Sequence, residues 1–127
     1  MREITTHKVN GLNDALKIVA TDDPGSGGAN HAYLIYADES KVILGDGVTV
    51  SASINFQNGP IKEAGVNGLS NEALLAVVID RLQCFQNGPF KCRENALALT
   101  KLEEAMHWLN NRTAIRQKRG VEGAHEV

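Results

Sequence analysis

The sequence holds little of what usually signals metal binding, membrane insertion or nucleic-acid binding. It has only 2 cysteines and 4 histidines in 127 residues, and their spacing matches neither a CxxC redox pair nor a common zinc site. No apolar run approaches the roughly 20 residues of a membrane span. The formal net charge of -2 argues against the broad basic surfaces that bind nucleic-acid polymers. We therefore expect no metal, no cofactor, no membrane contact and no nucleic-acid polymer as partner.

Motifs of catalytic chemistry are also missing. The glycine cluster at residues 25–28 lacks the lysine and hydroxyl residue of a phosphate-binding loop, which favours a flexible strand connection. The carboxylate pairs Asp22-Asp23 and Glu103-Glu104 are sequence neighbours, whose side chains do not converge on one substrate atom. No serine or cysteine stands in a recognisable nucleophile motif. The sequence therefore predicts a protein without catalytic residues.

The first half of the chain has the alternation that is typical of β-strands. Apolar residues occupy every second position of residues 48–57, which predicts a half-buried antiparallel strand. Shorter apolar or β-branched runs predict further strands. These are residues 3–9, 16–20, 31–37 and 41–44. We expect a small antiparallel sheet in this part of the chain.

Helical spacing of apolar residues replaces this alternation after residue 69. Ser70 can accept the first free amide hydrogens of a helix, which we expect to end near Cys84 or Phe85. The sequence Asn-Gly-Pro then interrupts the chain, and a second helix is expected from near Cys92 to Gly120. Its apolar residues form a regular seam that favours a partner helix. The seam consists of Leu99, Leu102, Met106 and Leu109.

Together these patterns predict an α+β fold in a single domain, 1–127. Its parts are a small N-terminal antiparallel β-sheet (1–69), an antiparallel two-helix hairpin (70–119) and a short tail (120–127). The cysteines are expected to be reduced, because the chain reads as a cytoplasmic protein without a signal peptide.

Positive charge collects in the last two turns of the second helix. Basic residues there complement the negative end of the helix dipole, which explains them without a ligand. Arg112 and Arg116 nevertheless lie four positions apart, hence on one face, and that face continues the seam where a partner helix is expected. This position favours an anionic ligand, and we expect both arginines to be exposed or to face it.

Three stretches of the sequence are similar to a known family. They are FQNGPIKEAGVNGLSNEALLAVVIDRL, FQNGPFKCRENALALTKLEEAMHWLNNRT and RGVEGAH. The chain from about Ile54 to His125 resembles the first-described family of phage anti-Thoeris sponge proteins. Its helical hairpin further resembles that of the phage sponges that sequester cyclic dinucleotides in anti-CBASS defence.

The resemblance implies a non-enzymatic protein of the host bacterial cytoplasm that binds and hides cyclic ADP-ribose isomers, with cyclic di- or trinucleotides as further candidate ligands. It implies a protein that is oligomeric through its helices, a homodimer or hexamer with the pocket shared between chains. It also implies ligand-binding roles for four residues: the ring of Phe85 holds the adenine, Asn95 contacts the ligand, and Arg112 and Arg116 grip the phosphates. Lys62 is the residue considered for a separate cyclic-oligonucleotide site.

Each of these residues also has a purely structural interpretation. Phe85 could close the core of the hairpin, and Asn95 could be an ordinary first-turn residue of its helix. Trp108 is expected in core or interface packing rather than as a stacking platform. Two other functions stay open at this point. One is an enzyme that cleaves the same signals, and the other is an adaptor that binds nucleic acid or protein through the basic helix end.

Overall fold

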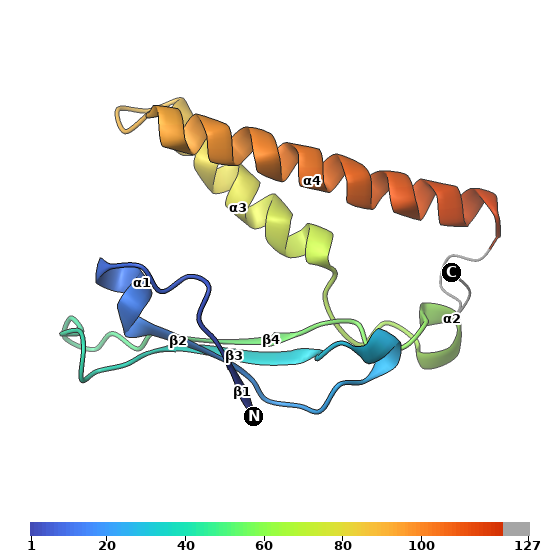
Figure 1. Ribbon diagram of the computed structural model, residues 1–127, viewed down its shortest axis with the longest axis horizontal. Coiled ribbons are helices and arrows are strands. Elements are labelled where there is room, and N and C mark those ends of the chain that lie inside the picture. Colours follow the sequence, from blue (N-terminus) through green and yellow to red (C-terminus); the bar gives the residue numbers. More distant parts are fainter. Residues whose placement is uncertain (121–127) are drawn as a thin grey trace. The chain divides into compact units, whose positions relative to one another are not determined.

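The computed structural model describes residues 1–120, and its N-terminal unit, Met1–Asn58, is built on an antiparallel sheet (Figure 1). Its strands follow one another across the sheet in sequence order. They are β1 (Arg2–Ile4), β2 (Leu16–Ala20), β3 (Ala32–Ala37) and β4 (Ser51–Asn55). The chain from Gly59 onward forms the second unit. Most of the expected tail, residues 121–127, lies outside the described residues.

The strands confirm part of the sequence-based expectation. The strands predicted at residues 16–20 and 31–37 are present, whereas those predicted at 3–9 and 48–57 are shorter than expected. The strand predicted at 41–44 is wrong. The Asp38 carboxylate accepts hydrogen bonds from the backbone N–H and the hydroxyl of Ser40, at 3.1 and 2.6 Å. This turn redirects the chain directly after β3 and leaves the following segment irregular.

The strand register places apolar side chains on one face of the sheet. Ile18 of β2 lies opposite Ile35 of β3 and opposite Ile4 of β1. On the same face, the rings of Tyr33 and Phe56 meet edge to face with their centroids 5.7 Å apart. Most of these side chains are only half-buried. Within residues 1–120, the buried apolar side chains are those of three alanines, Ala15, Ala20 and Ala37.

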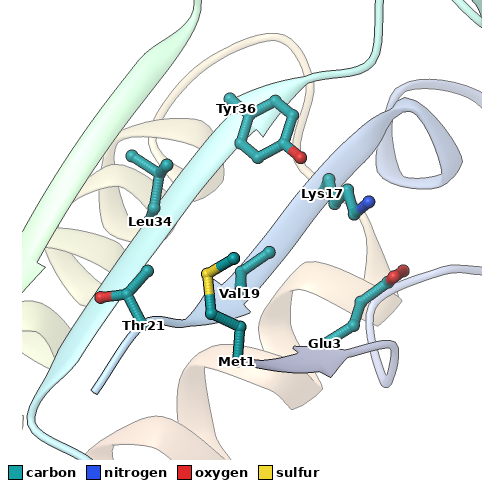
Figure 2. A pocket seen from close by; sticks show the side chains of 7 residues that line it. All are labelled: Met1, Glu3, Lys17, Val19, Thr21, Leu34 and Tyr36. Carbon is teal, nitrogen blue, oxygen red and sulfur yellow. The ribbon is translucent and has the colours of Figure 1, made fainter.

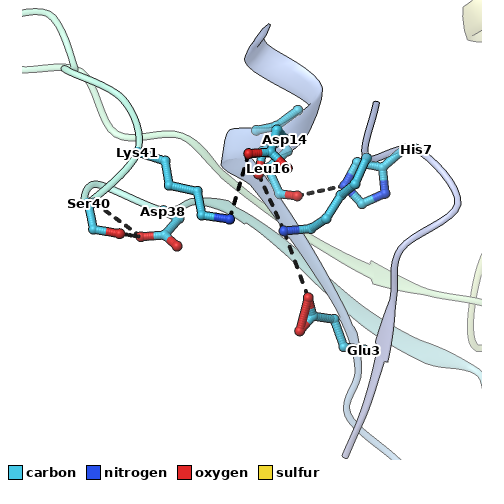
Figure 3. Close-up of polar contacts among 8 residues, drawn as sticks. Glu3, His7, Asp14, Leu16, Asp38, Ser40 and Lys41 are labelled. Atoms are coloured by element: carbon cyan, nitrogen blue, oxygen red, sulfur yellow. Dashed lines mark hydrogen bonds and ion pairs between the residues drawn. The ribbon is translucent and has the colours of Figure 1, made fainter. Parts of the chain in front are cut away.

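A short helix, α1 (Gly11–Ala15), precedes β2 and was not predicted (Figure 3). Polar contacts hold its acidic residue. The Asp14 carboxylate lies 3.7 Å from the Lys41 ammonium nitrogen. The backbone carbonyl of Asp14 accepts a hydrogen bond of 3.3 Å from the Lys8 ammonium group. Lys8 also lies 3.8 Å from the carboxylate of Glu3. The ion pair of Asp14 with Lys41 is exposed on both sides, and such pairs contribute little free energy, whereas the Lys8 side chain is only 17% exposed.

The connection between β2 and β3 is held by one carboxylate. Asp22 accepts hydrogen bonds from the backbone N–H groups of His31, at 3.0 Å, and Ala32, at 3.2 Å. The side-chain amide of Asn30 donates to the same carboxylate at 3.4 Å. These bonds, with that from His31 the largest cause, lower the pKa of Asp22 below its ordinary value. The connection, which was expected to be flexible, also contains a turn, η1 (Ser26–Gly28), where the Gly28 N–H donates to the Gly25 carbonyl at 2.9 Å and Gly27 has a φ of 74°.

The second unit contains three helices within its described part. They are α2 (Ile61–Ala64), α3 (Asn71–Gln86) and α4 (Arg93–Lys118). α3 and α4 form the predicted antiparallel hairpin, and α2 was not predicted (Figure 1). The hydroxyl of Ser70 accepts a hydrogen bond of 3.1 Å from the Ala73 amide, which confirms the predicted cap of α3.

Side chains and a glycine fix the tight connection between α3 and α4. The side-chain oxygen of Gln86 accepts a hydrogen bond of 3.0 Å from the backbone N–H of Cys92. The Cys92 sulfur in turn accepts from the Asn95 amide at 3.4 Å and caps the start of α4. Gly88 lies between them in a tight place, where a Cβ would lie 3.3 Å from the carbonyl oxygen of Cys84. Both cysteines are free.

Candidate anion-binding site

The C-terminal part of α4 carries an open pocket of about 290 Å³. Three arginines and no carboxylate line it. The lining residues are Trp108, Asn111, Arg112, Ile115, Arg116 and Arg119. Guanidinium groups offer forked pairs of donors that match phosphate oxygens. The pocket therefore has the charge and the hydrogen-bonding groups that an anion requires.

The two arginines predicted to hold phosphate differ in their surroundings. Arg112 is exposed, whereas Arg116 is only 8% exposed. The difference follows from the helix, because Arg116 continues the inner face of Met106 and Leu109 while Arg112 lies nearer the outer face. Both were expected to be exposed or to face the ligand, and of the two only Arg112 is exposed. Arg116 lines the pocket with most of its side chain covered.

α4 also has a second apolar face, which points away from the predicted seam. The set consists of Leu97, Trp108 and Ile115, which are separated by 11 and then 7 residues. Because each residue advances the helix by about 100°, these three side chains lie on one side of α4. We call this set the outer stripe. Their exposed fractions are 47%, 67% and 50%. Trp108 is thus not a core residue of this chain, and its expected role in an interface stays a prediction.

The other two predicted ligand residues lie at the connection between the helices. Phe85 is half-buried in the last turn of α3, and Asn95 is half-buried in the first turn of α4. The guanidinium carbon of Arg81 lies 4.9 Å from the centroid of the Phe85 ring, which is a cation–π contact. Sequence analysis missed Arg81. Its signal was an arginine one helical turn before an aromatic residue.

One chain does not bring the four predicted residues together. α4 runs unbroken from Arg93 to Lys118. At 1.5 Å per residue, its stretch from Asn95 to Arg112 is about 25 Å long. The structure therefore groups Phe85 with Asn95 at the connection and Arg112 with Arg116 far along α4.

Two further pockets have a different chemistry. One, of about 290 Å³, lies on the sheet of the N-terminal unit, where Figure 2 shows Lys17 and Glu3 beside Val19, Leu34 and other side chains. Its carboxylate and ammonium groups offset each other, so it offers no net charge to an anion. The other pocket, about 300 Å³, includes the single cation Lys62.

Neither a metal centre nor a membrane span is found in the part of the chain that the structure describes. No group of three or more histidine, cysteine or acidic side chains in residues 1–120 is placed to hold a metal ion. The described helices include none with the length and hydropathy to cross a bilayer.

Comparison with known proteins links the hairpin to a described domain. The sequence model of the Acb2/Tad1 hairpin domain matches residues 49–114, which include β4, α3 and most of α4. The chain is also 58% identical over 89 residues to "Thoeris anti-defense 1" of the Bacillus phage SBSphiJ7. That match takes in 70% of this chain and 63% of the phage protein, so the chain spans less than two thirds of the length of its relative.

Proposed function

Because the chain belongs to the Acb2/Tad1 hairpin-domain family, we propose that it is a phage anti-defence sponge, which binds and sequesters cyclic ADP-ribose isomers without degrading them. These isomers are the immune signals of the Thoeris system. Cyclic di- and trinucleotides, the signals of CBASS, are further candidate ligands. The site of action under this proposal is the cytoplasm of the infected host, where the signals are made.

The observation that carries this proposal is the arginine pocket on α4. A cyclic ADP-ribose isomer offers a diphosphate, ribose hydroxyls and an adenine ring. Arg112 and Arg116 supply the guanidinium forks for the diphosphate, Asn95 an amide for the hydroxyls, and Phe85 a ring for the base. Stacking contributes about 1–3 kcal/mol, and each charge-assisted hydrogen bond about 1.5–3 kcal/mol. A nanomolar dissociation constant, about -12 kcal/mol, is within reach of such a set.

Sharing the pocket between chains resolves the separation along α4. An antiparallel pair of hairpins would set Arg112 and Arg116 of one chain beside Phe85 and Asn95 of the other. The outer stripe supports such a pairing, because large exposed apolar groups on one helix face favour a partner helix. The sparse core supports it as well. In residues 1–120 no large apolar side chain is fully buried, which favours an oligomer that covers them, a homodimer or a hexamer.

Recovery of the bound small molecule from the protein distinguishes capture of the signal from its cleavage. The protein is incubated with a cyclic ADP-ribose isomer, freed of unbound ligand and denatured, and the released small molecule is identified by mass spectrometry. A sponge returns the intact signal in stoichiometric amount. Release of a linear or hydrolysed product would instead identify an enzyme. A protein that retains no signal would contradict the proposal.

A charge-reversal variant provides the matched control for this experiment. Arg112→Glu removes a guanidinium from the pocket, whereas Lys118→Glu makes the same charge change at an exposed position of the same helix that the pocket does not include. We expect Lys118→Glu to return as much intact signal as the unmodified protein. Arg112→Glu should return almost none. Equal recovery from the two variants would remove the arginine pocket from the proposal.

A further inference from the structure

Arg81 is directed at a residue of the proposed site, although it is not one of the predicted ligand residues. Its guanidinium carbon lies 4.9 Å from the centroid of the Phe85 ring. Both residues stand on α3, one helical turn apart, and the Arg81 side chain is exposed. No ion pair within residues 1–120 involves Arg81. The ring is therefore the described partner of this cation.

The geometry assigns the two faces of the Phe85 ring to different partners. A guanidinium group is planar and weakly hydrated, and it stacks on the negative face of an aromatic ring within about 6 Å of the centroid. A face that is covered in this way cannot receive a purine. A base that stacks on Phe85 must therefore use the opposite face, and the cation also restrains the rotation of the ring in the free protein.

We propose that Arg81 is a positioning residue of the ligand pocket, whose guanidinium occupies one face of the Phe85 ring so that an adenine base stacks on the other. The inference rests on the proposed function, because it requires that Phe85 receives a base. It adds a residue and a direction of approach to that function. Arg81 acts through the ring and makes no contact with the phosphates.

A double-mutant cycle tests whether Arg81 acts through the ring. The affinity for a cyclic ADP-ribose isomer is measured by calorimetry for the unmodified protein, Arg81→Gln, Phe85→Leu and the double variant. We expect Arg81→Gln alone to weaken binding about two- to fivefold, because the ring is then no longer held in the orientation that receives the base. In the Phe85→Leu background the same change should have no further effect. Phe85→Met serves as a second background if Phe85→Leu does not fold.

The cycle separates this role from a direct contact between Arg81 and phosphate. A phosphate contact would cost the same affinity in both backgrounds and would weaken as salt is added. That result, or an unchanged affinity of Arg81→Gln, would contradict the positioning role. Lys118→Gln is the control, because it removes one positive charge from the hairpin at an exposed position away from the ring. It should bind like the unmodified protein, and Arg81→Gln and Lys118→Gln should both keep the circular dichroism spectrum of the folded protein.

A proton NMR measurement shows which face the ligand takes. Because the Arg81 guanidinium lies over the Phe85 ring, we expect the resonances of the adjoining δ-methylene protons to be shifted upfield and to lose this shift in Phe85→Leu. The shift should persist when the ligand binds. Its absence from the free protein would contradict the contact, and its loss on binding would show that the base displaces Arg81. If the unmodified protein binds no cyclic ADP-ribose isomer, the proposed function itself fails, which calorimetry reports separately from either outcome.

Discussion

Arg112 is the better of the two pocket arginines for a mutational test of phosphate binding. It is exposed, so Arg112→Glu should leave the helical hairpin folded while it removes a charge-assisted contact and adds a repulsive carboxylate. We expect affinity for cyclic ADP-ribose isomers to fall by at least tenfold, about 1.4 kcal/mol, in a calorimetric titration. Far-ultraviolet circular dichroism and the melting temperature should not change. An unaltered affinity would show that Arg112 does not contact the ligand.

The effect of the same substitution at Arg116 has to be interpreted differently. Because only 8% of this residue is exposed, Arg116→Glu places a carboxylate where the structure covers a cation. A loss of binding in this variant reports on folding as well as on the pocket. Helical periodicity predicted that the two arginines share a side of α4. It could not predict the difference in burial, which depends on what packs against each residue.

Asp22 links the stability of the N-terminal unit to pH. Its hydrogen bonds to His31, Ala32 and Asn30 lower the folded-state pKa below the ordinary value of 3.8. A lowered pKa means that the carboxylate stabilises the fold above that value, and that this contribution is lost as the pH falls through the folded-state pKa. Asp22→Asn should therefore lower the melting temperature at pH 7, and the difference from the unmodified protein should disappear in strong acid.

The neighbouring carboxylate provides the control for this pH dependence. Asp23 is exposed and makes none of the hydrogen bonds that hold the loop. Melting curves of Asp23→Asn should follow those of the unmodified protein from pH 7 down to strong acid. A constant difference between Asp22→Asn and the unmodified protein at every pH would show that the effect of Asp22 is not electrostatic.

The start of α3 depends on a local side-chain cap. The Ser70 hydroxyl holds the Ala73 amide at 3.1 Å, and loss of such a cap costs about 1 kcal/mol. Ser70→Ala should lower the melting temperature by about 4 °C, whereas Ser70→Asp, which keeps an acceptor oxygen, should stay close to the unmodified protein. Thermal unfolding followed by circular dichroism measures both. Equal melting temperatures for Ser70→Ala and Ser70→Asp would mean that the cap adds nothing.

Elements with a strong local signal were predictable from the sequence, and those without one were not. α3 and α4 have long apolar periodicity and are separated by a helix-breaking Asn-Gly-Pro sequence, and β2 and β3 have compact runs of apolar residues that are β-branched or aromatic. α1 and α2 span 5 and 4 residues, and neither has a side-chain hydrogen bond at its N-cap. A single turn without a cap carries no periodic pattern. The failed strand at 41–44 had the right composition, but the turn at Asp38 leaves it no partner strand.

The candidate site was predictable to the extent that it lies on a helix. The sequence was enough to place Arg112 and Arg116 on one side of α4, and the structure confirms that both line one pocket. The contact of Arg81 with Phe85 needs side-chain positions that periodicity does not supply. Whether Phe85 and Asn95 contact a ligand stays a prediction.

At the scale of the whole molecule, the outer stripe should control the oligomeric state. Trp108 is its largest member and is 67% exposed in the single chain. We expect native mass spectrometry to detect a dimer or hexamer for the unmodified protein and a shift toward monomer for Trp108→Ser, because the partner loses a large aromatic contact. Ile43→Ser is the control, since Ile43 is also exposed but lies in an irregular segment of the N-terminal unit, outside the hairpin. An unchanged mass distribution for Trp108→Ser would exclude this stripe as the interface.

Mixed dimers test whether the pocket is shared between chains. In a dimer of one Asn95→Ala chain and one Arg112→Glu chain, one pocket carries both lesions, while the other combines an unmodified Asn95 with an unmodified Arg112. Co-refolding these two inactive variants with different tags should restore about one ligand site per mixed dimer. Calorimetry on the doubly purified species measures that stoichiometry. If confirmed mixed dimers recover no site, the two halves of the pocket do not come from different chains.

Because α4 is uninterrupted, it limits which insertions and deletions the protein can accept. If the pocket combines the connection of one hairpin with the far end of another α4, then α4 sets the spacing between them. Inserting one residue in its middle would rotate Arg112 by about 100° away from its face, whereas seven residues would restore the face and move it by about 10 Å. Substitutions in the middle of α4 should therefore be tolerated far better than insertions or deletions. Natural length variation in this segment should come in steps of about two helical turns, and each step would resize the space open to a ligand.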